Sequence, residues 1–158
     1  MKCLVTGGAG FIGSNLVDKL IDNGNEVVVI DNLSTGKEEN INSKAKFYRK
    51  DITQMRRNSD FTMFEGVDVV FHTAALARVQ PSIEDPVSYD KVNVGGTLQI
   101  LKACVDYNVK RFVFASSMSV YGNRYQPPFS EDLPPYPMDS YGIAKFSVEQ
   151  DLRVAYEQ

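Results

Sequence analysis

The sequence lacks several features that would assign its class at once. No run approaches the roughly 20 apolar residues of a membrane-spanning helix. A single histidine and two cysteines argue against a protein-built zinc site, so we expect no metal. The net charge is only -3, and no stripe of lysine and arginine carries interleaved aromatics, which argues against a nucleic-acid partner. Organic cofactor chemistry remains open.

The lack of a signal peptide and the small number of cysteines bear on the cellular compartment. A strand pattern begins at Lys2, directly after Met1, and leaves no room for a signal peptide, so we expect a cytoplasmic protein. Cys3 and Cys104 lie among apolar neighbours in expected regular elements. We expect buried, reduced thiols there, with a disulfide as the alternative.

Five short apolar runs, rich in β-branched and aromatic residues, predict strands. They are KCLVT (2–6), EVVVI (26–30), AKFYRK (45–50), VDVVFHT (67–73) and RFVFAS (111–116). Helical patterns lie between most of them and after the last. Helices are expected over residues 11–24, 55–66, 88–108 and 140–158. Strands that alternate with helices predict an α/β fold with a parallel sheet and right-handed crossovers.

The expected helices carry apolar faces and end signals. The faces are Ile12, Leu16, Leu20 and Ile21 on the first helix, and Leu98, Leu101 and Val105 on the third. Asn23 and Gly24 end the first helix, and Asp139 or Ser140 is the N-cap of the last. The proline-rich segment 125–139 before it is expected to be an ordered loop over a site, with a plain surface loop as the alternative.

A glycine-rich turn follows the first strand and opens the first helix, where Gly7, Gly10 and Gly13 fit GxxGxxG. The first glycine permits the tight turn, the second lets the backbone approach a pyrophosphate, and the third lets the helix pack on the strand. Phosphates would sit at the helix start, beside Phe11 and Ile12. With its strand, its helix and an acidic residue further on, the turn indicates dinucleotide binding in a Rossmann-like, doubly wound sheet of order 3-2-1-4-5.

That acidic residue, Asp31, ends the second strand. Its carboxylate can accept hydrogen bonds from an adenosine ribose and would repel a 2'-phosphate, so we expect NAD rather than NADP. Lys37 is the one nearby cation that could bind a phosphate instead. Asn32, Ser34 and Gly36 are further residues expected to bind the cofactor, and Asp51 and Ile52, at the end of the third strand, are expected beside the adenine. For the last two, a helix cap followed by a core residue is the alternative.

Seven short motifs follow one another along the chain: TGGAGFIGS, DNLSTG, DI, HTAA, VNVGGT, SSMSVYG and YGIAK. Together they resemble extended short-chain dehydrogenase/reductases, above all nucleotide-sugar 4-epimerases of the UDP-glucose 4-epimerase type. The resemblance covers essentially all 158 residues but only the N-terminal half of such enzymes. It implies an NAD-binding Rossmann domain over residues 1–158, with the C-terminal substrate domain absent, as in a fragment or a truncated protein.

The resemblance also implies catalytic residues. Tyr141 of YGIAK would be the acid/base, and Lys145 would lower the pKa of that phenol and hold the nicotinamide ribose. Ser117 would hydrogen-bond the reacting hydroxyl, with Ser116 and Ser119 as rivals. In an extended backbone alternate residues share a side, so we expect Ser117 and Ser119 to face together and Ser116 to point elsewhere.

Further residues surround the expected cofactor. Thr73, Ala74 and Ala75 are small, which lets the backbone pass close to the cofactor. In the family Asn93 braces the active site through backbone contacts, against the alternative of an exposed polar residue. His72 is expected to be structural rather than catalytic. Arg78 either reaches a substrate phosphate or is solvated.

The implied reaction is epimerisation at C4 of a nucleotide sugar of the UDP-glucose, UDP-GlcNAc or UDP-glucuronate type, by transient hydride transfer to NAD. Family dehydratases carry an acidic pair where this chain has Met118 and Ser119. A dehydratase or decarboxylase of the same family, or a non-catalytic NAD-binding module, is the alternative. A homodimer is expected through helices near residues 90–107 and 140–158. The chain by itself is expected to bind NAD weakly and to turn over poorly.

Overall fold

The computed structural model describes residues 1–157, so only Gln158 of the last expected helix lies outside the described residues. The chain divides into two compact units. The first comprises Met1–Ala75 and Gln99–Ala115, and the second comprises Leu76–Leu98 and the segment from Ser116 onward. Each unit is described separately below.

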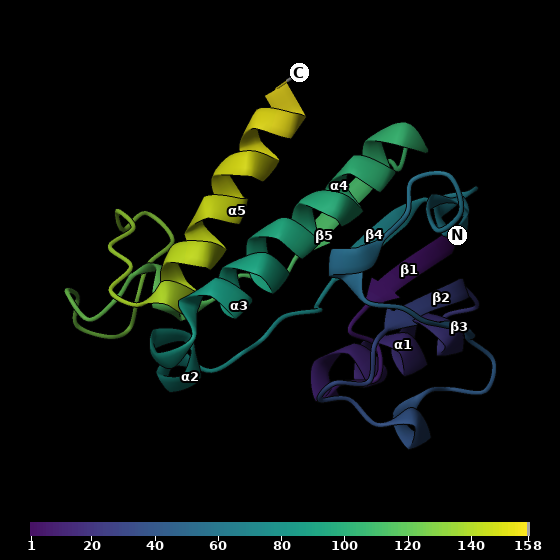
Figure 1. The fold of residues 1–158 in the computed structure, drawn as a ribbon, viewed down its shortest axis with the longest axis horizontal. Coiled ribbons are helices and arrows are strands. Elements are labelled where there is room, and N and C mark those ends of the chain that lie inside the picture. Colours follow the sequence, from purple (N-terminus) through teal and green to yellow (C-terminus); the bar gives the residue numbers. More distant parts are fainter. Residues whose placement is uncertain (158) are drawn as a thin grey trace. The chain divides into compact units, whose positions relative to one another are not determined.

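The first unit contains a five-stranded parallel sheet in the order β3-β2-β1-β4-β5 (Figure 1). The strands are β1 (Lys2–Thr6), β2 (Glu26–Asp31), β3 (Lys46–Arg49), β4 (Val69–His72) and β5 (Arg111–Phe114). The helix α1 (Phe11–Asp22) connects β1 to β2. The predicted α/β fold, the five strands and their order are therefore confirmed.

Both faces of the central strands are buried. Leu4 pairs in register with Val28 and Val70, and all three are almost fully inaccessible to solvent. The neighbouring residues Val5 and Val29 point the other way and form a second buried cluster with Val17 of α1. The continuous apolar runs in the sequence reflect this burial on both faces, which is typical of parallel sheets.

Helix α1 follows its expected bounds, but not all of its apolar face is buried. Leu16, Leu20 and Ile21 pack partly buried against the core, whereas Ile12 is 66% exposed. Asn23 is the C-cap residue and Gly24 follows with φ of 77°, so the predicted helix end is confirmed.

The helix predicted over residues 55–66 is wrong. Only a single 3-10 turn, η3 (Phe61–Phe64), forms there. The carboxylate of Asp60 accepts the Arg56 N–H and pairs with Lys50 at 2.9 Å. A side chain that bonds the backbone in this way competes with helix formation.

Two shorter 3-10 turns lie in the loops after β2 and β3. They are η1 (Glu38–Asn40) and η2 (Ile52–Gln54). Both occur in the segments that the sequence assigns to the adenosine, and η2 begins directly after Asp51.

Helix α4 (Thr97–Asp106) precedes β5, and its predicted apolar face is also wrong. Leu98 and Val105 are 40% and 58% exposed, while the buried side chains include Ile100 and Cys104. Thr97 and Ala103 are buried as well, so the buried face is built largely from short side chains.

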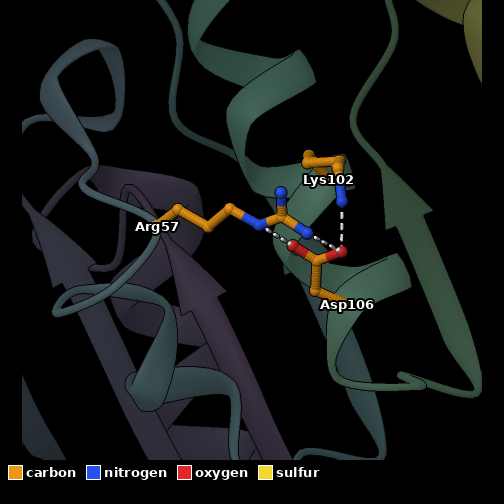
Figure 2. Close-up of polar contacts among 3 residues, drawn as sticks. All are labelled: Arg57, Lys102 and Asp106. Carbon is orange, nitrogen blue, oxygen red and sulfur yellow. Dashed lines mark hydrogen bonds and ion pairs between the residues drawn. The ribbon is translucent and has the colours of Figure 1, made fainter.

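The end of α4 is fixed to the loop before η3. Asp106 accepts hydrogen bonds from Nε and Nη2 of Arg57 at 2.8 and 3.2 Å and also pairs with Lys102, as Figure 2 shows. The hydrogen bond from Lys102 is the main reason why the pKa of Asp106 lies below its usual value. A hollow of about 570 Å³ beside this cluster is lined by Arg57, Asn58, Phe61, Asp106 and Tyr107.

The second unit is mostly helical. It contains α2 (Val79–Glu84), α3 (Pro86–Asp90), the π-helical turn η4 (Lys91–Gly96), the 3-10 turn η5 (Met118–Val120) and α5 (Ser140–Glu157). Within this unit α5 packs against α2, α3, η4 and η5 (Figure 1). None of the helices in residues 1–157 combines the length and apolar character that crossing a membrane requires.

Candidate functional site

The three glycines of the motif are required for different local reasons. Gly7 has φ of 71°, and a Cβ atom on it would lie 2.7 Å from the backbone nitrogen of Ala74. A Cβ on Gly13 would lie 2.2 Å from the Gly7 carbonyl oxygen. On Gly10 the nearest atom would be 3.3 Å away, so packing within the chain restricts this position far less. Gly10 is therefore the position where a missing side chain benefits a ligand most.

The start of α1 is open to an anion. Gly10 occupies the N-cap position in an extended conformation, and no side chain among the described residues caps this helix. Phe11 and Ile12 are 85% and 66% exposed. Free N–H groups and the positive end of the helix dipole favour phosphate at such a helix start.

Asp31 is 9% exposed at the end of β2 and holds the turn in place. One carboxylate oxygen accepts the Ala9 N–H at 3.0 Å, and the other accepts the Leu33 N–H at 2.7 Å. The Ala9 carbonyl in turn accepts hydrogen bonds from the Lys37 N–H at 3.1 Å and Asn40 Nδ2 at 2.9 Å. Each carboxylate oxygen keeps a further lone pair, so Asp31 can also accept hydrogen bonds from a ribose diol.

The loop after Asp31 lies close to the glycine turn. A Cβ on Gly36 would approach the Ala9 carbonyl carbon to 2.8 Å, which explains the glycine. Ser34 donates its N–H to the Asn32 side chain. The Lys37 side chain pairs with Glu39 in solvent, 3.3 Å away.

Asp51 and Ile52 also have roles within the fold. Asn32 Nδ2 donates to Asp51 at 3.2 Å, and the other Asp51 oxygen accepts the Thr53 N–H and hydroxyl as the N-cap of η2. Ile52 is buried. The alternative role for this pair, a cap followed by a core residue, is therefore present, and a contact with adenine stays a prediction.

The segment after β4 is fixed by Thr6. Its hydroxyl lies 2.8 Å from His72 Nδ1 and accepts the Ala74 N–H at 3.3 Å, while its carbonyl accepts the Thr73 hydroxyl at 2.7 Å. His72 is fully buried and stacks on Phe112. The expectation of a structural histidine is confirmed.

The thiols behave as expected. Cys3 and Cys104 are both free and buried, and burial raises the pKa of Cys104 to about 12. A thiol held protonated in this way is a poor nucleophile and a poor metal ligand. Among the described residues, no three His, Cys, Asp or Glu side chains gather to hold a metal ion.

In the second unit the three serines separate as predicted. Ser117 Oγ accepts the Ser119 N–H at 3.2 Å and lies 3.3 Å from Ser119 Oγ. Ser116 instead donates its hydroxyl to Glu149 on α5. The predicted shared side of Ser117 and Ser119 is confirmed.

Tyr141 and Lys145 lie one turn apart at the start of α5. Lys145 is only 3% exposed, and burial lowers the pKa of its ammonium group to about 8. Burial also raises the pKa of Tyr141, and the opposing hydrogen bond with Ser117 is smaller. In the chain without cofactor, desolvation of the phenolate thus outweighs the nearby polar groups, and the expectation that Lys145 and an oxidised nicotinamide together favour the phenolate stays a prediction.

Three residues hold α5, and two of them, Gly142 and Ser82, were not predicted from the sequence. Asp139 accepts the Gly142 N–H at 2.8 Å, which settles the N-cap in favour of Asp139. A Cβ on Gly142 would lie 2.6 Å from the Ser119 carbonyl oxygen, so this glycine permits close packing of α5 on η5. Ser82 of α2 accepts the Tyr141 N–H at 3.2 Å.

Asn93 is buried inside the π-helical turn and forms two hydrogen bonds with the backbone of Leu76. Its Oδ1 accepts the Leu76 N–H at 2.8 Å, and its Nδ2 donates to the Leu76 carbonyl at 3.0 Å. The expected bracing through backbone contacts is thus observed, and the alternative of an exposed polar residue is wrong. Arg78 is exposed at the start of α2.

The proline-rich segment is an ordered loop. Its contacts include the Tyr136 N–H to the Val120 carbonyl at 2.9 Å and the Tyr125 hydroxyl to the Pro134 carbonyl at 2.9 Å. Arg124 lies over the Tyr136 ring. The expectation that the proline-rich loop lies over a site stays a prediction.

Comparison with known proteins assigns the chain to a protein family. The sequence pattern of the NAD dependent epimerase/dehydratase family matches residues 3–158. The chain belongs to this family. UDP-glucose 4-epimerases of Lactobacillus helveticus and Streptomyces lividans are both 42% identical to the chain, over 95% and 94% of its length.

Solved epimerase structures share the fold. A UDP-glucose 4-epimerase of Thermotoga maritima with UDP-glucose is 43% identical, with a TM-score of 0.94 over 100% of this chain. A Thermus thermophilus UDP-glucose 4-epimerase in complex with NAD is 41% identical, with a TM-score of 0.89 over 98%. The chain covers 46% and 45% of the two sequence relatives and 52% and 50% of the two structures, so it spans about half their length.

Proposed function

We propose that the chain supplies the NAD-binding and proton-transfer half of a nucleotide-sugar 4-epimerase. The observation that carries this proposal is the joint presence of two features: a glycine turn with an open helix start, and a half-buried Tyr141 that lies beside the buried Lys145 and has Ser117 as its polar neighbour. A sensor or scaffold would need the first feature but not the second.

The adenosine end of NAD would be held by the first unit. The free N–H groups at the start of α1 would bind the pyrophosphate, and Asp31 would accept from the ribose hydroxyls. Asn32, Ser34 and Asp51 would line the adenosine. The negative charge of Asp31 would disfavour a 2'-phosphate, so NAD is the proposed cofactor.

The proton chemistry would belong to the second unit. When bound, NAD supplies the acceptor and donor of hydride at C4 of the sugar. Tyr141, as phenolate, would take the proton of the 4-hydroxyl and later return it. Ser117 would donate to the same oxygen and hold it in place while the 4-keto sugar turns its other face.

Lys145 would help Tyr141 to lose its phenol proton. Its pKa of about 8 lies above neutrality, so the ammonium group is largely charged at pH 7. A positive charge beside the ring would favour loss of the phenol proton, and together with an oxidised nicotinamide it would have to outweigh the burial that raises the pKa of Tyr141. We assign the reaction to the cytoplasm, where the free thiols Cys3 and Cys104 would stay reduced.

The substrate proposed is a UDP-sugar, and a homodimer is proposed through the two long helices. Exposed apolar side chains on α4 include Leu98 and Val105, and those on α5 include Val154 and Tyr156. Light scattering of the purified chain should give twice the monomer mass, and the monomer mass at all concentrations would contradict the dimer.

The decisive experiment joins this chain to the C-terminal half of the Lactobacillus helveticus epimerase, the half that the chain does not cover. With UDP-glucose and NAD, NMR should detect UDP-galactose as the product. Calorimetry on the 158-residue chain should separately detect NAD binding. A fused protein that binds NAD but yields a dehydrated or decarboxylated sugar would overturn the epimerase assignment.

A further inference from the structure

The backbone of Tyr141 is held by a residue from another helix. The first N–H groups of a helix have no partner within it. In α5 the Gly142 N–H is satisfied locally by Asp139, whereas the Tyr141 N–H donates to Ser82 Oγ on α2 at 3.2 Å. The helix start is therefore capped twice, once from its own chain neighbour and once from 59 residues away.

The geometry of Ser82 suits this role. Its side chain is fully buried, and its hydroxyl donates to the Val79 carbonyl at 2.6 Å. A serine hydroxyl has one proton and two lone pairs. Since the proton is committed to Val79, the oxygen faces Tyr141 as an acceptor only.

The helix that carries Ser82 is itself anchored. Leu76, three residues before α2, is gripped at both its N–H and its carbonyl by Asn93. Asn93 is thus hydrogen-bonded to Leu76, the chain leads from Leu76 directly into α2, and Ser82 of α2 is hydrogen-bonded to the Tyr141 backbone. This arrangement restrains the position from which the Tyr141 side chain projects.

We propose that Ser82 is a positioning residue for Tyr141, which caps α5 from α2 and keeps the phenol beside Ser117. The importance of this position for turnover rests on the proposed function, because it assumes that Tyr141 is the acid/base. Without the Ser82 oxygen, the Tyr141 N–H loses its partner and the first turn of α5 loosens. The phenol then leaves its half-buried place and its hydrogen bond with Ser117.

Amide hydrogen exchange of the 158-residue chain tests the bond directly. In the wild-type chain the Tyr141 amide should be protected to a similar degree as the Gly142 amide, and a fully unprotected Tyr141 amide would overturn the proposal. In Ser82→Ala, exchange at Tyr141 should rise at least tenfold while Gly142, capped by Asp139, changes little. Ser147→Ala, an exposed serine on the same helix, should leave both rates unchanged.

Ultraviolet titration tests the effect on the phenol. The difference between a variant and the same variant with Tyr141→Phe isolates the ionisation of Tyr141. Its midpoint should move in Ser82→Ala from a raised value toward that of an exposed tyrosine, and it should stay in place in Ser147→Ala. An unmoved midpoint together with unchanged exchange would refute the positioning role.

The two proposals fail separately. If Ser82→Ala shifts the phenol midpoint but Tyr141→Phe keeps full turnover in the fused enzyme, then the function is wrong and the positioning stands. If Tyr141→Phe abolishes turnover and Ser82→Ala changes neither exchange nor titration, the positioning is wrong and the function stands.

Discussion

The ammonium nitrogen of Lys145 lies over the ring of Tyr141, 5.7 Å from its centroid. Side chains four residues apart share one face of a helix, and here both partners are drawn into the protein rather than into solvent. The spacing in YGIAK thus places a buried ammonium group over the ring of a half-buried phenol.

Replacing Tyr141 by phenylalanine should remove the proton acceptor while leaving the ring in place. We expect the epimerisation rate of the fused enzyme to fall by about 10² to 10⁴, the usual contribution of a positioned acid or base. NAD affinity, measured by calorimetry, should change less than threefold. Retention of the wild-type rate would show that another group carries the proton.

Stability should depend on pH through Lys145. Burial lowers its pKa from 10.5 to about 8, so between these values the unfolded chain binds more protons than the native chain. The free energy of unfolding should therefore rise with pH in this window, by up to about 1.4 kcal/mol per pH unit, and the contribution should be flat below pH 8.

Urea denaturation between pH 7 and 10 measures this slope. Lys145→Met, which cannot titrate, should lose the rise, and the exposed Lys44→Met should retain it. The slopes are compared below about pH 9, where the phenol of Tyr141 stays protonated in the native and the unfolded chain, so its ionisation does not contribute. Equal slopes in all three proteins would mean that Lys145 has an ordinary pKa.

Gly142 and Gly95 form a matched pair in the second unit. A Cβ on Gly142 would meet the Ser119 carbonyl oxygen at 2.6 Å, whereas nothing lies within 4 Å of a Cβ on Gly95. We expect Gly142→Ala to destabilise the chain by about 1–3 kcal/mol through overpacking. Gly95→Ala should stabilise it by about 0.5–1 kcal/mol, as alanine does in an exposed helical position. Thermal unfolding of both variants provides the test, and equal effects would contradict the packing argument.

Gly10 and Gly13 separate ligand binding from folding. Gly13→Ala should cost about 3 kcal/mol or more, because its Cβ would lie 2.2 Å from the Gly7 carbonyl oxygen. Gly10→Ala should leave the unfolding free energy within about 1 kcal/mol of wild type. Its NAD affinity should nevertheless fall at least tenfold, about 1.4 kcal/mol, since the new methyl group occupies the approach of the pyrophosphate. A Gly10→Ala chain with unaltered NAD affinity would place the phosphates elsewhere.

The sheet could be predicted from the sequence because its signals are local. Runs such as 27–30 are apolar throughout, which indicates a strand covered on both faces, and the glycine turn follows from chain geometry at Gly7. The face of α4 could not be predicted in this way. Its buried side includes Thr97 and Ala103, whose short side chains carry little hydrophobic signal compared with the exposed Leu98 and Val105.

Contacts between distant segments account for the rest. No pattern in the sequence links Ser82 to the Tyr141 N–H, because a serine in a short helix has many possible partners. The helix predicted at 55–66 failed for a related reason, since Asp60 satisfies the Arg56 N–H and pairs with Lys50 from the preceding loop. Periodicity reports which side chains are apolar, but not which backbone groups a polar side chain will satisfy.

The Ala9 N–H donates a hydrogen bond to Asp31, and the Ala9 carbonyl accepts hydrogen bonds from Lys37 and Asn40. An engineer who wished to retune this protein for a phosphorylated dinucleotide would find the usual single exchange at position 31 insufficient. Removing that carboxylate would also leave the Ala9 and Leu33 N–H groups without their acceptor and loosen the glycine turn. The stretch from 31 to 40 would have to be redesigned as one piece, with a new acceptor for Ala9 installed alongside any new cation.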